Sequence, residues 1–461
     1  MSAGAVTAEA PATRAVAAAR EPALPPGPSY PRALQTLGWI ARPGPFMERC
    51  RERYGDVFTL RVASEGTWVF VSDPSAVEQV FKGDPRFLHA GEGNAILRPI
   101  LGRHSVLLLD EGPHMRQRKL MLPSFHGKRM RGYGELMTEI AEAEVARWPI
   151  GEPLELWPRM QAVTLEIIMR AVFGVREAER LDRLRAALRR ALDLTTDRTS
   201  MVAFAALGPD RVGRLRILRR ALDPVDELLL DEIRSRRSDP GLSERDDVMS
   251  MLVQARYEDG RAMADAELRD ELMTLLVAGH ETTATALAWA VERLVRHPDK
   301  LGRLRDEVAA GEDAYLDAVV HETLRLRPVL PIVVRRLTEP VEIAGHLLPA
   351  GASVTPCIYL IHRRSDVYPE PARFLPERFL SEPPGTYTWI PFGGGVRRCL
   401  GASFALFEMK TVLSVVATRA RLRATRPASE RISRRAITLT PSRRAEVVID
   451  STDGAGARRC A

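Results

Sequence analysis

The stretch that most constrains this chain is residues 263–297, where apolar side chains recur at three- and four-residue intervals. That spacing predicts one long α-helix, and a helix of about 30 residues runs about 45 Å, enough to cross a whole domain. Six further stretches share the periodicity and are expected to be helices: 134–148, 160–173, 176–193, 213–237, 313–327 and 402–418. We therefore expect a mainly helical fold crossed by one long helix.

Strand patterns are fewer and shorter. Residues 57–62 and 67–71 flank a short Gly-containing turn and predict a β-hairpin. A second β region is expected over 333–354, interrupted at Gly345 and again at 349–351. No internal repeat or long linker divides the chain. The pattern therefore predicts a mainly α fold with small β-sheets, in a single domain.

We expect that domain to span residues 24–450. The Ala-rich residues 1–23 lack the apolar core of a secretory signal and are expected to form a disordered tail. Residues 451–461 are expected to form a short flexible tail. Nothing in the chain is an uninterrupted apolar run of about 20 residues, so we expect no membrane anchor.

Charge and cysteine content narrow the function classes. The 461 residues carry a formal net charge of +7, and arginine supplies nearly all of the positive charge. These arginines are dispersed among Asp and Glu with no basic-aromatic block, so we expect no nucleic-acid partner. The four cysteines, at 50, 357, 399 and 460, form no CxxC pair that would suggest zinc. So few thiols indicate a reducing cytoplasm.

Residues 392–401 read FGGGVRRCLG and surround one thiol, Cys399, with glycine and positive charge. Nearby cations and a following helix N-terminus favour a thiolate, and the preceding glycines let backbone N–H groups turn toward the sulfur. Gly401 lets a flat ligand lie close. One thiolate cannot form a tetrahedral zinc site, but it can be the axial ligand of a haem. The alternative is a Gly-rich turn with a buried cysteine.

This segment resembles the haem-binding loop of the cytochrome P450 family, F-x-x-G-x-R-x-C-x-G, at every fixed position. The resemblance extends over about residues 25–450 and implies haem b (iron protoporphyrin IX) as the cofactor in a triangular-prism fold. It makes Cys399 the iron ligand. The further cofactor-binding residues that it implies in this loop are Phe392, Gly393, Arg397 and Gly401.

Inside the long helix, residues 278–283 read AGHETT. A mid-helix glycine costs about 1 kcal/mol against alanine, and the threonines can bond back one turn and bend the helix, which together suit an opening toward a cavity. A pair of core hydroxyls is the alternative. The segment resembles the family's oxygen-activation motif, A-G-x-[DE]-T-[TS]. The resemblance implies that Thr282 steadies dioxygen, Glu281 relays protons and Ala278 contacts the haem.

Glu322-Thr-Leu-Arg325 is by itself an ordinary ion pair on one helix face. Followed by FLPERF at 374–379, it resembles the family's structural triad. The match implies a buried ion network of Glu322, Arg325 and Arg378 that serves folding and haem retention.

A last cationic group is expected around the haem propionates, which need neutralising cations when buried. His114 and Arg118 are four residues apart and share a helix face, which is also the pattern of a solvated basic surface. They resemble the family's H-x-x-x-R. Arg335 stands where the family often has another propionate partner, although Arg336 is its neighbour, and Arg397 completes the set.

The resemblance implies a haem-thiolate monooxygenase that inserts one oxygen atom from O2 into an apolar small molecule such as a terpenoid, steroid, polyketide or fatty acid. No nucleotide-binding motif is fused to the chain, so electrons from NAD(P)H are expected to arrive through a separate ferredoxin reductase and ferredoxin. A basic docking face for the ferredoxin is expected from four cations: Arg116, Lys119, Arg398 and Lys410.

The apolar substrate is expected to contact segments 90–108, 191–212, 328–334 and 437–439 and the first half of the long helix. Three alternatives remain open at this point. They are a peroxide-driven peroxygenase of the same family, a non-enzymatic haem sensor, and a helical scaffold without cofactor.

Overall fold

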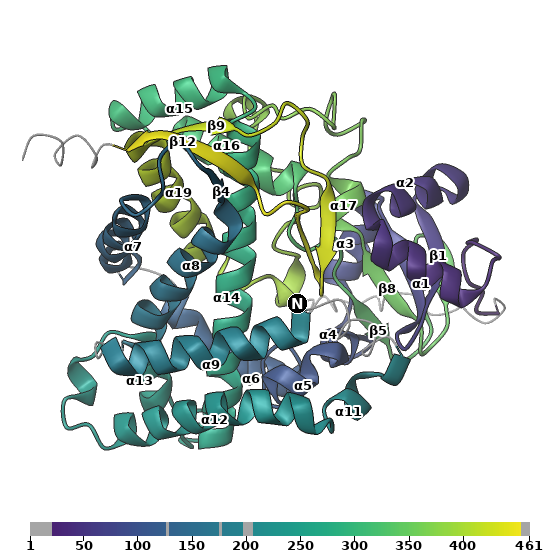
Figure 1. Cartoon of the computed structure of the whole chain (residues 1–461). Coiled ribbons are helices and arrows are strands. Elements are labelled where there is room, and N and C mark those ends of the chain that lie inside the picture. Colours follow the sequence, from purple (N-terminus) through teal and green to yellow (C-terminus); the bar gives the residue numbers. More distant parts are fainter. Residues whose placement is uncertain (1–20, 126–128, 175–177, 197–205, 453–461) are drawn as a thin grey trace, which may run out of the picture.

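The computed structural model describes residues 21–125, 129–174, 178–196 and 206–452. Helices make up most of it; strands β1, β5 and β8 lie on one side together with α1 and α2, and strands β4, β9 and β12 lie on the other side, near α15 and α19 (Figure 1). The prediction of a mainly α fold with small β-sheets is confirmed. Residues 1–20 and 453–461, which hold most of the two predicted tails, lie outside the described residues.

The long helix is α14 (Asp265–Leu294), 30 residues without interruption. Its start is fixed by Glu267, whose carboxylate accepts the backbone N–H of Ala264 at 2.7 Å, as a capping side chain does. Residues 283–294 are all buried. In Figure 1 the helix runs through the centre of the molecule, from α16 (Ala314–Leu326) at one end to α12 (Arg216–Arg237) at the other, and it contacts both.

All seven predicted helices are present, with ends within a few residues of the predicted ones. Besides α12, α14 and α16 they are α7 (Arg129–Val145), α8 (Leu156–Phe173), α9 (Ala178–Thr196) and α19 (Ala402–Arg419). Further helices were not predicted from apolar periodicity because they are short or strongly polar. The longer ones are α1 (Arg32–Ala41), α2 (Pro43–Tyr54), α3 (Pro74–Lys82), α6 (Glu111–Met121), α13 (Val248–Gln254) and α15 (Pro298–Ala309).

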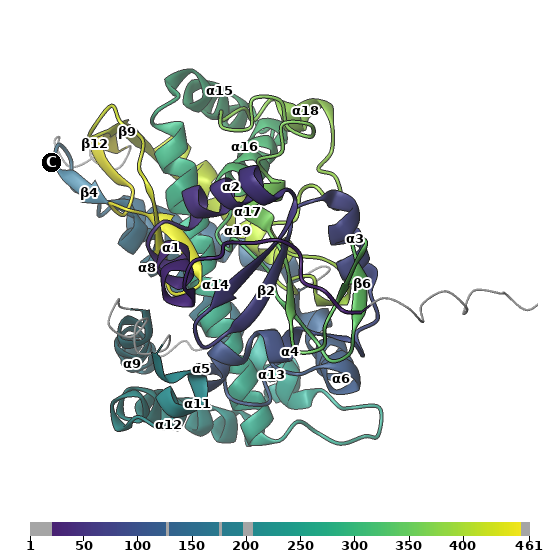
Figure 2. The ribbon, with the colours of Figure 1, turned by 90° about the vertical axis from the view of Figure 1, so that its right-hand side faces the viewer.

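The largest sheet has five strands in the order β1-β2-β8-β5-β3. Their bounds are β1 (Val57–Val62), β2 (Gly66–Val71), β3 (Leu88–His89), β5 (Arg335–Leu337) and β8 (Ser353–Pro356). The predicted hairpin is confirmed, since β1 and β2 pair antiparallel with Val57 opposite Val71. Figure 2 views the molecule from this side, with β2 toward the reader and α14 behind it.

The predicted second β region contains β5, β8 and a hairpin between them, β6 (Val341–Ile343) and β7 (His346–Leu348). Its turn is Ala344-Gly345, with φ of 50° and 76°. Two-residue hairpin turns of this kind need positive φ at both positions, so the glycine that interrupts the strand pattern is the turn itself.

Two small sheets were not predicted. One has the order β4-β12-β9, formed by β4 (Pro153–Glu155), β9 (Ala420–Ala424) and β12 (Glu446–Thr452). Strand β12 extends two residues into the segment expected to be a tail, because Ser451 and Thr452 pair with β9. The other is the hairpin β10 (Ile432–Arg435) and β11 (Thr438–Pro441), which is fastened to α14 where the Trp289 indole N–H donates to the Leu439 carbonyl at 2.9 Å.

Within the described ranges, none of the helices combines the length and the apolar character that crossing a membrane requires.

Candidate functional site

The middle of α14 is open on one face. Ala278 is exposed and Val277, Gly279 and Thr282 are only half-buried, although the helix on either side of them is mostly buried. The Thr282 hydroxyl donates to the Ala278 carbonyl at 2.6 Å, which leaves its oxygen able to accept another hydrogen bond. An exposed patch at the centre of a core helix indicates that a space inside the molecule meets α14 at the AGHETT motif.

Gly279 has a different task from the one that the sequence suggested. A Cβ at this position would lie 2.4 Å from Cδ1 of Ile168 on α8, far inside van der Waals contact. The glycine therefore allows α8 to pack closely against α14, rather than opening the helix toward the cavity. Helix α14 stays continuous through the motif.

Glu281 is 8% exposed and contacts two side chains of the β10–β11 hairpin. The Arg435 guanidinium lies 3.5 Å from its carboxylate, and the Thr438 hydroxyl donates to the same oxygen at 3.5 Å. Burying a carboxylate is costly unless it is paired or protonated, so the pairing explains how an acid can stand next to Thr282. Arg435 has no local sequence pattern that would have identified it.

The loop before α19 presents Cys399 to open space. The Cys399 N–H donates to the Phe392 carbonyl at 3.0 Å, which closes the loop. Its glycines fit the loop against α3: a Cβ on Gly394 would lie 2.2 Å from the Phe81 ring, and one on Gly395 would lie 2.1 Å from the Phe81 carbonyl oxygen. These two glycines are thus required by packing, which the sequence alone did not indicate.

The surroundings of the Cys399 thiol are mixed. Its side chain is exposed, yet dense protein around it raises the pKa of the thiol, opposed by the Gly401 N–H and by the charges of Arg118 and Arg398. Both observations fit a thiol that faces a space within the protein. A Cβ added to Gly401 would meet no atom within 4 Å, so that space continues beside the sulfur. A Cβ added to Gly393, which has a φ of 65°, would meet Val333 at 3.6 Å, an ordinary van der Waals distance.

The predicted cations converge. Burial, followed by the charges of Arg397, Arg118 and Arg335, lowers the pKa of His114 to about 3, which shows that these groups lie close to one another. Burial also lowers the pKa of Arg335 and of Arg397 to about 10. Among the residues that the structure describes, Asp110 is the carboxylate that offsets the charges of these two arginines, and it pairs with Arg397. The cluster therefore keeps an excess of positive charge, as a site for an anion would.

Arg335 and Arg336 are neighbours in strand β5, and their side chains lie on opposite faces of the sheet. Arg335 is 6% exposed and belongs to the cluster, and its guanidinium donates to the neighbouring Val334 carbonyl at 2.9 Å. The Arg336 guanidinium instead lies next to Gly66 and Gly351. Successive side chains of a strand point to opposite faces, so Arg335 is the candidate for contact with the anion.

The predicted ion network is confirmed. Glu322 and Arg325 are both fully buried and joined at 2.6 Å and 2.8 Å, and Arg378 lies 3.3 Å from Glu322. Arg325 also donates to three backbone carbonyls. The network ties α16 to the irregular segment that leads to Cys399.

Two of the four cations expected to dock a ferredoxin are already paired within the chain. Lys119 lies 2.9 Å from Glu258, and Lys410 lies 3.0 Å from Asp317. Arg116 and Arg398 are exposed. The basic face is therefore smaller than the sequence suggested.

Several acids near the site were not predicted, and most of them are buried. Asp110 directly precedes α6, is half-buried, and forms an acidic pair with Glu111 ahead of the basic residues of that helix. Glu408 on α19 is completely buried, and burial raises its pKa well above the usual value, with the Thr283 hydroxyl beside it. Asp270 and Glu271 near the start of α14 are also buried. Nothing in a single sequence distinguishes such acids from surface ones on the same helices.

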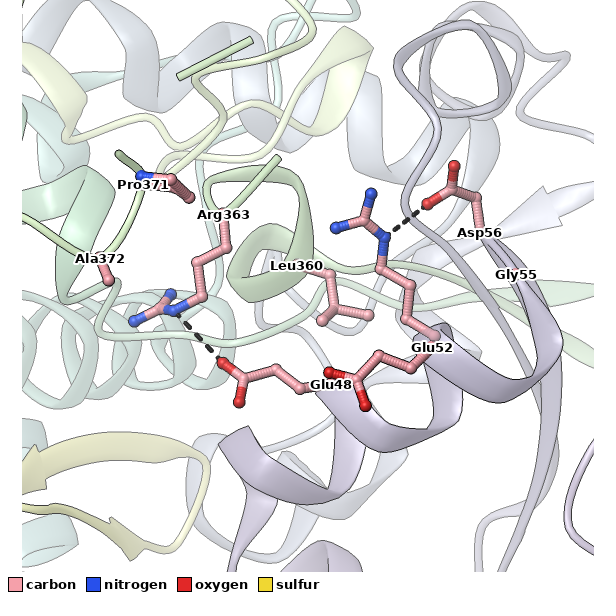
Figure 3. Close-up of a pocket in the computed structure, with 9 residues that line it drawn as sticks. Glu48, Glu52, Gly55, Asp56, Leu360, Arg363, Pro371 and Ala372 are labelled. Carbon is pink, nitrogen blue, oxygen red and sulfur yellow. Dashed lines mark hydrogen bonds and ion pairs between the residues drawn. The ribbon is translucent and has the colours of Figure 1, made fainter. Parts of the chain in front are cut away.

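A separate hollow of about 530 Å³ lies between α2 and α17 (Ile358–Ile361) (Figure 3). Charged side chains line it, and they form ion pairs, Arg51 with Asp56 at 2.7 Å and Arg363 with Glu48 at 3.7 Å. It contains none of the predicted site residues. In the described ranges, no group of three or more His, Cys, Asp or Glu side chains could hold a metal ion.

The residues present fit a haem. The accessible Cys399 thiol can bind the iron, and the open space beside Gly401 has room for a flat ring. The exposed patch on α14 borders the same space, and the buried cationic cluster can pair with the two propionate carboxylates. A thiolate is one of the protein ligands that haem iron accepts.

Comparison with known proteins gives the family. The cytochrome P450 family model matches residues 25–444. The chain is 44% identical over 435 residues to cytochrome P450 135B1 of Mycobacterium tuberculosis (93% of this chain, 92% of that protein) and 38% identical over 429 residues to its cytochrome P450 137 (91% and 90%).

Solved structures share the fold. The retinoic acid-bound cyanobacterial CYP120A1 superposes with a TM-score of 0.80 at 23% identity, covering 94% of this chain and 100% of that one. The heme domain of cytochrome P450DA gives 0.79 at 24% identity, covering 95% and 99%. The chain belongs to the cytochrome P450 family of haem-thiolate monooxygenases.

Proposed function

We propose that this enzyme inserts one oxygen atom from O2 into an apolar small molecule, with electrons that NAD(P)H supplies through a separate ferredoxin reductase and ferredoxin in the cytoplasm. The observation that carries the proposal is the acid–alcohol pair on α14. Thr282 lies at the open patch, and the neighbouring Glu281 is held on the β10–β11 hairpin. A peroxide-driven enzyme or a haem sensor needs no such pair.

In this proposal Cys399 binds the iron, and Phe392, Gly393, Gly401 and Ala278 border the ring. Gly401 and Ala278 suit this role because both face open space. Bound haem supplies the chemistry that cleaves dioxygen and transfers one oxygen atom to the substrate.

The cationic cluster orients the ring. His114, Arg118, Arg335 and Arg397 hold the two propionates, whose negative charge balances the excess of cations. The neutral His114 imidazole, with its pKa near 3, donates a single hydrogen bond without adding further charge to the cluster.

On the distal side, this chain's own groups handle the proton. The Thr282 hydroxyl, donating to Ala278, orients an acceptor oxygen toward the open patch. Glu281 carries a proton from the hairpin side of α14, and Arg435 holds the carboxylate between transfers. A positioned acid contributes typically 10²–10⁴-fold to such reactions.

Several apolar side chains in the segments expected to contact the substrate are incompletely buried, which supports an apolar substrate. Leu97, Ile100 and Leu107 precede α6, Val277 lies on α14, and Val333 precedes β5, and all are half-buried. Ile437, in the turn of the hairpin, is 38% exposed. Residues 197–205 of the expected wall lie outside the described residues. A binding site lined in this way favours a largely apolar ligand.

The electron-transfer partner is proposed to dock over Arg116 and Arg398, since Lys119 and Lys410 are engaged within the chain. Reversing the charge of both arginines should slow reduction of the enzyme and weaken its dependence on salt. An unchanged rate and salt dependence would exclude this face.

The experiment is turnover under ¹⁸O2 with a bacterial ferredoxin, its reductase and NADPH. Apolar compounds for it are first selected by a spectral shift of the ferric protein. We expect one ¹⁸O atom in each product molecule. Equal turnover with hydrogen peroxide alone would instead identify a peroxygenase. A spectral response to ligands without any product from either oxidant would identify a sensor.

A further inference from the structure

The segment 102–110 between α5 (Arg98–Leu101) and α6, here called the strap, is held to α14 by polar side chains. Asp270 accepts the backbone N–H of His104 at 2.8 Å and faces its imidazole Nδ1 at 3.0 Å. Glu271 accepts the N–H of Val106 at 2.7 Å. The Thr274 hydroxyl donates to the Asp270 carbonyl of its own helix at 2.6 Å and lies 2.7 Å from the Ser105 hydroxyl. Three side chains within five residues of α14 therefore contact three successive residues of the strap.

The same strap is held from the opposite side by the loop that carries Cys399. The Arg397 guanidinium donates to the Val106 carbonyl at 3.3 Å and to the Leu109 carbonyl, and it pairs with Asp110. The peptide groups of Val106 are thus shared, because Glu271 binds its N–H and Arg397 binds its carbonyl. Val106 links α14 to a cation that we place on a propionate.

Burial makes these contacts unusual. Asp270, Glu271 and Thr274 are 6%, 0% and 3% exposed. Two adjacent buried acids are expensive, whereas apolar side chains would join two segments at lower cost. Buried polar groups that have specific partners fix the position of one segment relative to another. Gly102 shows the specificity, since with φ of 81° it leaves no room for a Cβ, which would lie 2.0 Å from Asp270.

We propose that Asp270, Glu271 and Thr274 form a clamp that positions the strap 102–110 against the candidate haem site, so that loss of the clamp frees the strap and speeds the passage of bulky ligands to the iron. The three are positioning residues. The placement of the haem, and with it the effect on ligands, rests on the proposed function, whereas the clamp itself does not.

The clamp also connects to the helices that cover α14. Arg269 lies 2.9 Å from Asp270 and donates to Asp226 of α12 at 2.8 Å. The strap and α12 are therefore bound to the neighbouring residues Asp270 and Arg269 of one helix.

The test compares two substitutions of Glu271. Burial raises the pKa of Glu271 to about 8, so the side chain is mainly neutral at pH 7 and Glu271→Gln retains both its shape and its acceptor oxygen. Glu271→Leu removes the acceptor, so the Val106 N–H loses its partner, and so does the buried Gln117 side chain that also bonds to Glu271. Thr274→Val is a milder break of the clamp. Thr138→Val is the matched control, because the Thr138 hydroxyl bonds within its own helix α7, to the Gly134 carbonyl at 2.9 Å.

The first measurement is hydrogen–deuterium exchange of the purified holoenzyme. A lost hydrogen bond of ordinary strength corresponds to about a 2- to 10-fold change. We expect exchange in 104–107 to become about tenfold faster in Glu271→Leu and about threefold faster in Thr274→Val. Glu271→Gln and the control should match the parent enzyme, and the β1–β2 hairpin should be unaffected in all variants. Unchanged exchange in the strap of both breaking variants would overturn the clamp, and Thr274→Val decides alone if Glu271→Leu does not fold.

The second measurement is stopped-flow binding to the ferric protein of clotrimazole, a bulky azole, and of cyanide, which is small enough to pass a closed strap. Glu271→Leu should bind clotrimazole several-fold faster with cyanide unchanged, and Glu271→Gln should restore the parent rate. Equal effects on both ligands, or none on either, would overturn the role in ligand passage. A protein that contains no haem would contradict the proposed function, while the exchange experiment would still test the clamp.

Discussion

Replacing Arg325 with alanine should be among the most destabilising single changes in this protein. Arg325 and Glu322 are both 0% exposed. The guanidinium makes two bonds to Glu322, at 2.6 and 2.8 Å, and three to the carbonyls of His362, Pro371 and Arg373, at 2.7, 2.9 and 3.1 Å. Its removal leaves a buried carboxylate whose remaining cation, Arg378, is 3.3 Å away.

The size of the effect follows from what is left behind. Removing one partner of a buried ion pair costs about 3–5 kcal/mol, and each carbonyl left without a donor adds about 1–3 kcal/mol unless water enters. We therefore expect a loss of at least about 4 kcal/mol. Arg325→Lys should lose an intermediate amount, because an ammonium keeps the charge but cannot reproduce five planar donor contacts.

The assay is urea unfolding of the haem-containing protein, followed by haem absorbance and by far-UV circular dichroism. Where unfolding is irreversible, the unfolding rate replaces the equilibrium free energy. Arg373→Ala is the control, since its side chain is 63% exposed and pairs with Glu370 on the surface, an interaction worth about 0–1 kcal/mol. If Arg325→Ala came within about 1 kcal/mol of this control, the assignment of the network to folding would be wrong.

Three further predictions address the site. Gly401→Leu should fill the open space beside the thiol and lower the haem-to-protein absorbance ratio of folded material, and a parental ratio would contradict that placement of the ring. Thr282→Ala should keep its haem but consume NADPH with less product, whereas parental coupling would remove Thr282 from oxygen handling. Burial raises the pKa of Glu408 in the folded protein well above the value of about 4.5 in the unfolded chain. The stability of the parent protein should therefore fall as the pH rises from about 4.5 toward the pKa of the folded state. Relative to the parent, Glu408→Gln should gain stability over that range by up to about 1.4 kcal/mol per pH unit, and parallel pH curves would refute it.

The sequence predicted what depends on local pattern. The seven helices were found because each carries an apolar face at helical spacing, and the β1–β2 hairpin because its strands are close in the chain. Strand β4 pairs with β12, nearly three hundred residues later, and neither shows this relation in its own residues. The short helices α1 and α2 have too few turns for periodicity to separate them from loops.

The candidate site divides in the same way. Residues within a motif, such as Cys399 and Thr282, were recognised from their neighbours. The pairing of Glu281 with Arg435 depends on how a distant hairpin packs on α14. Gly279 and Gly394 were noticed in the sequence but given other roles, and only the structure shows that Ile168 and Phe81 pack closely against them.

The proposed monooxygenase function depends most directly on a bond between haem iron and the sulfur of Cys399. The decisive measurement is the absorbance spectrum of the reduced protein with carbon monoxide, for the parent and for Cys399→Ser. The account predicts the long-wavelength Soret band of thiolate ligation in the parent and its loss in the variant. A parent band at the position typical of imidazole ligation, or an unchanged band in the variant, would contradict it.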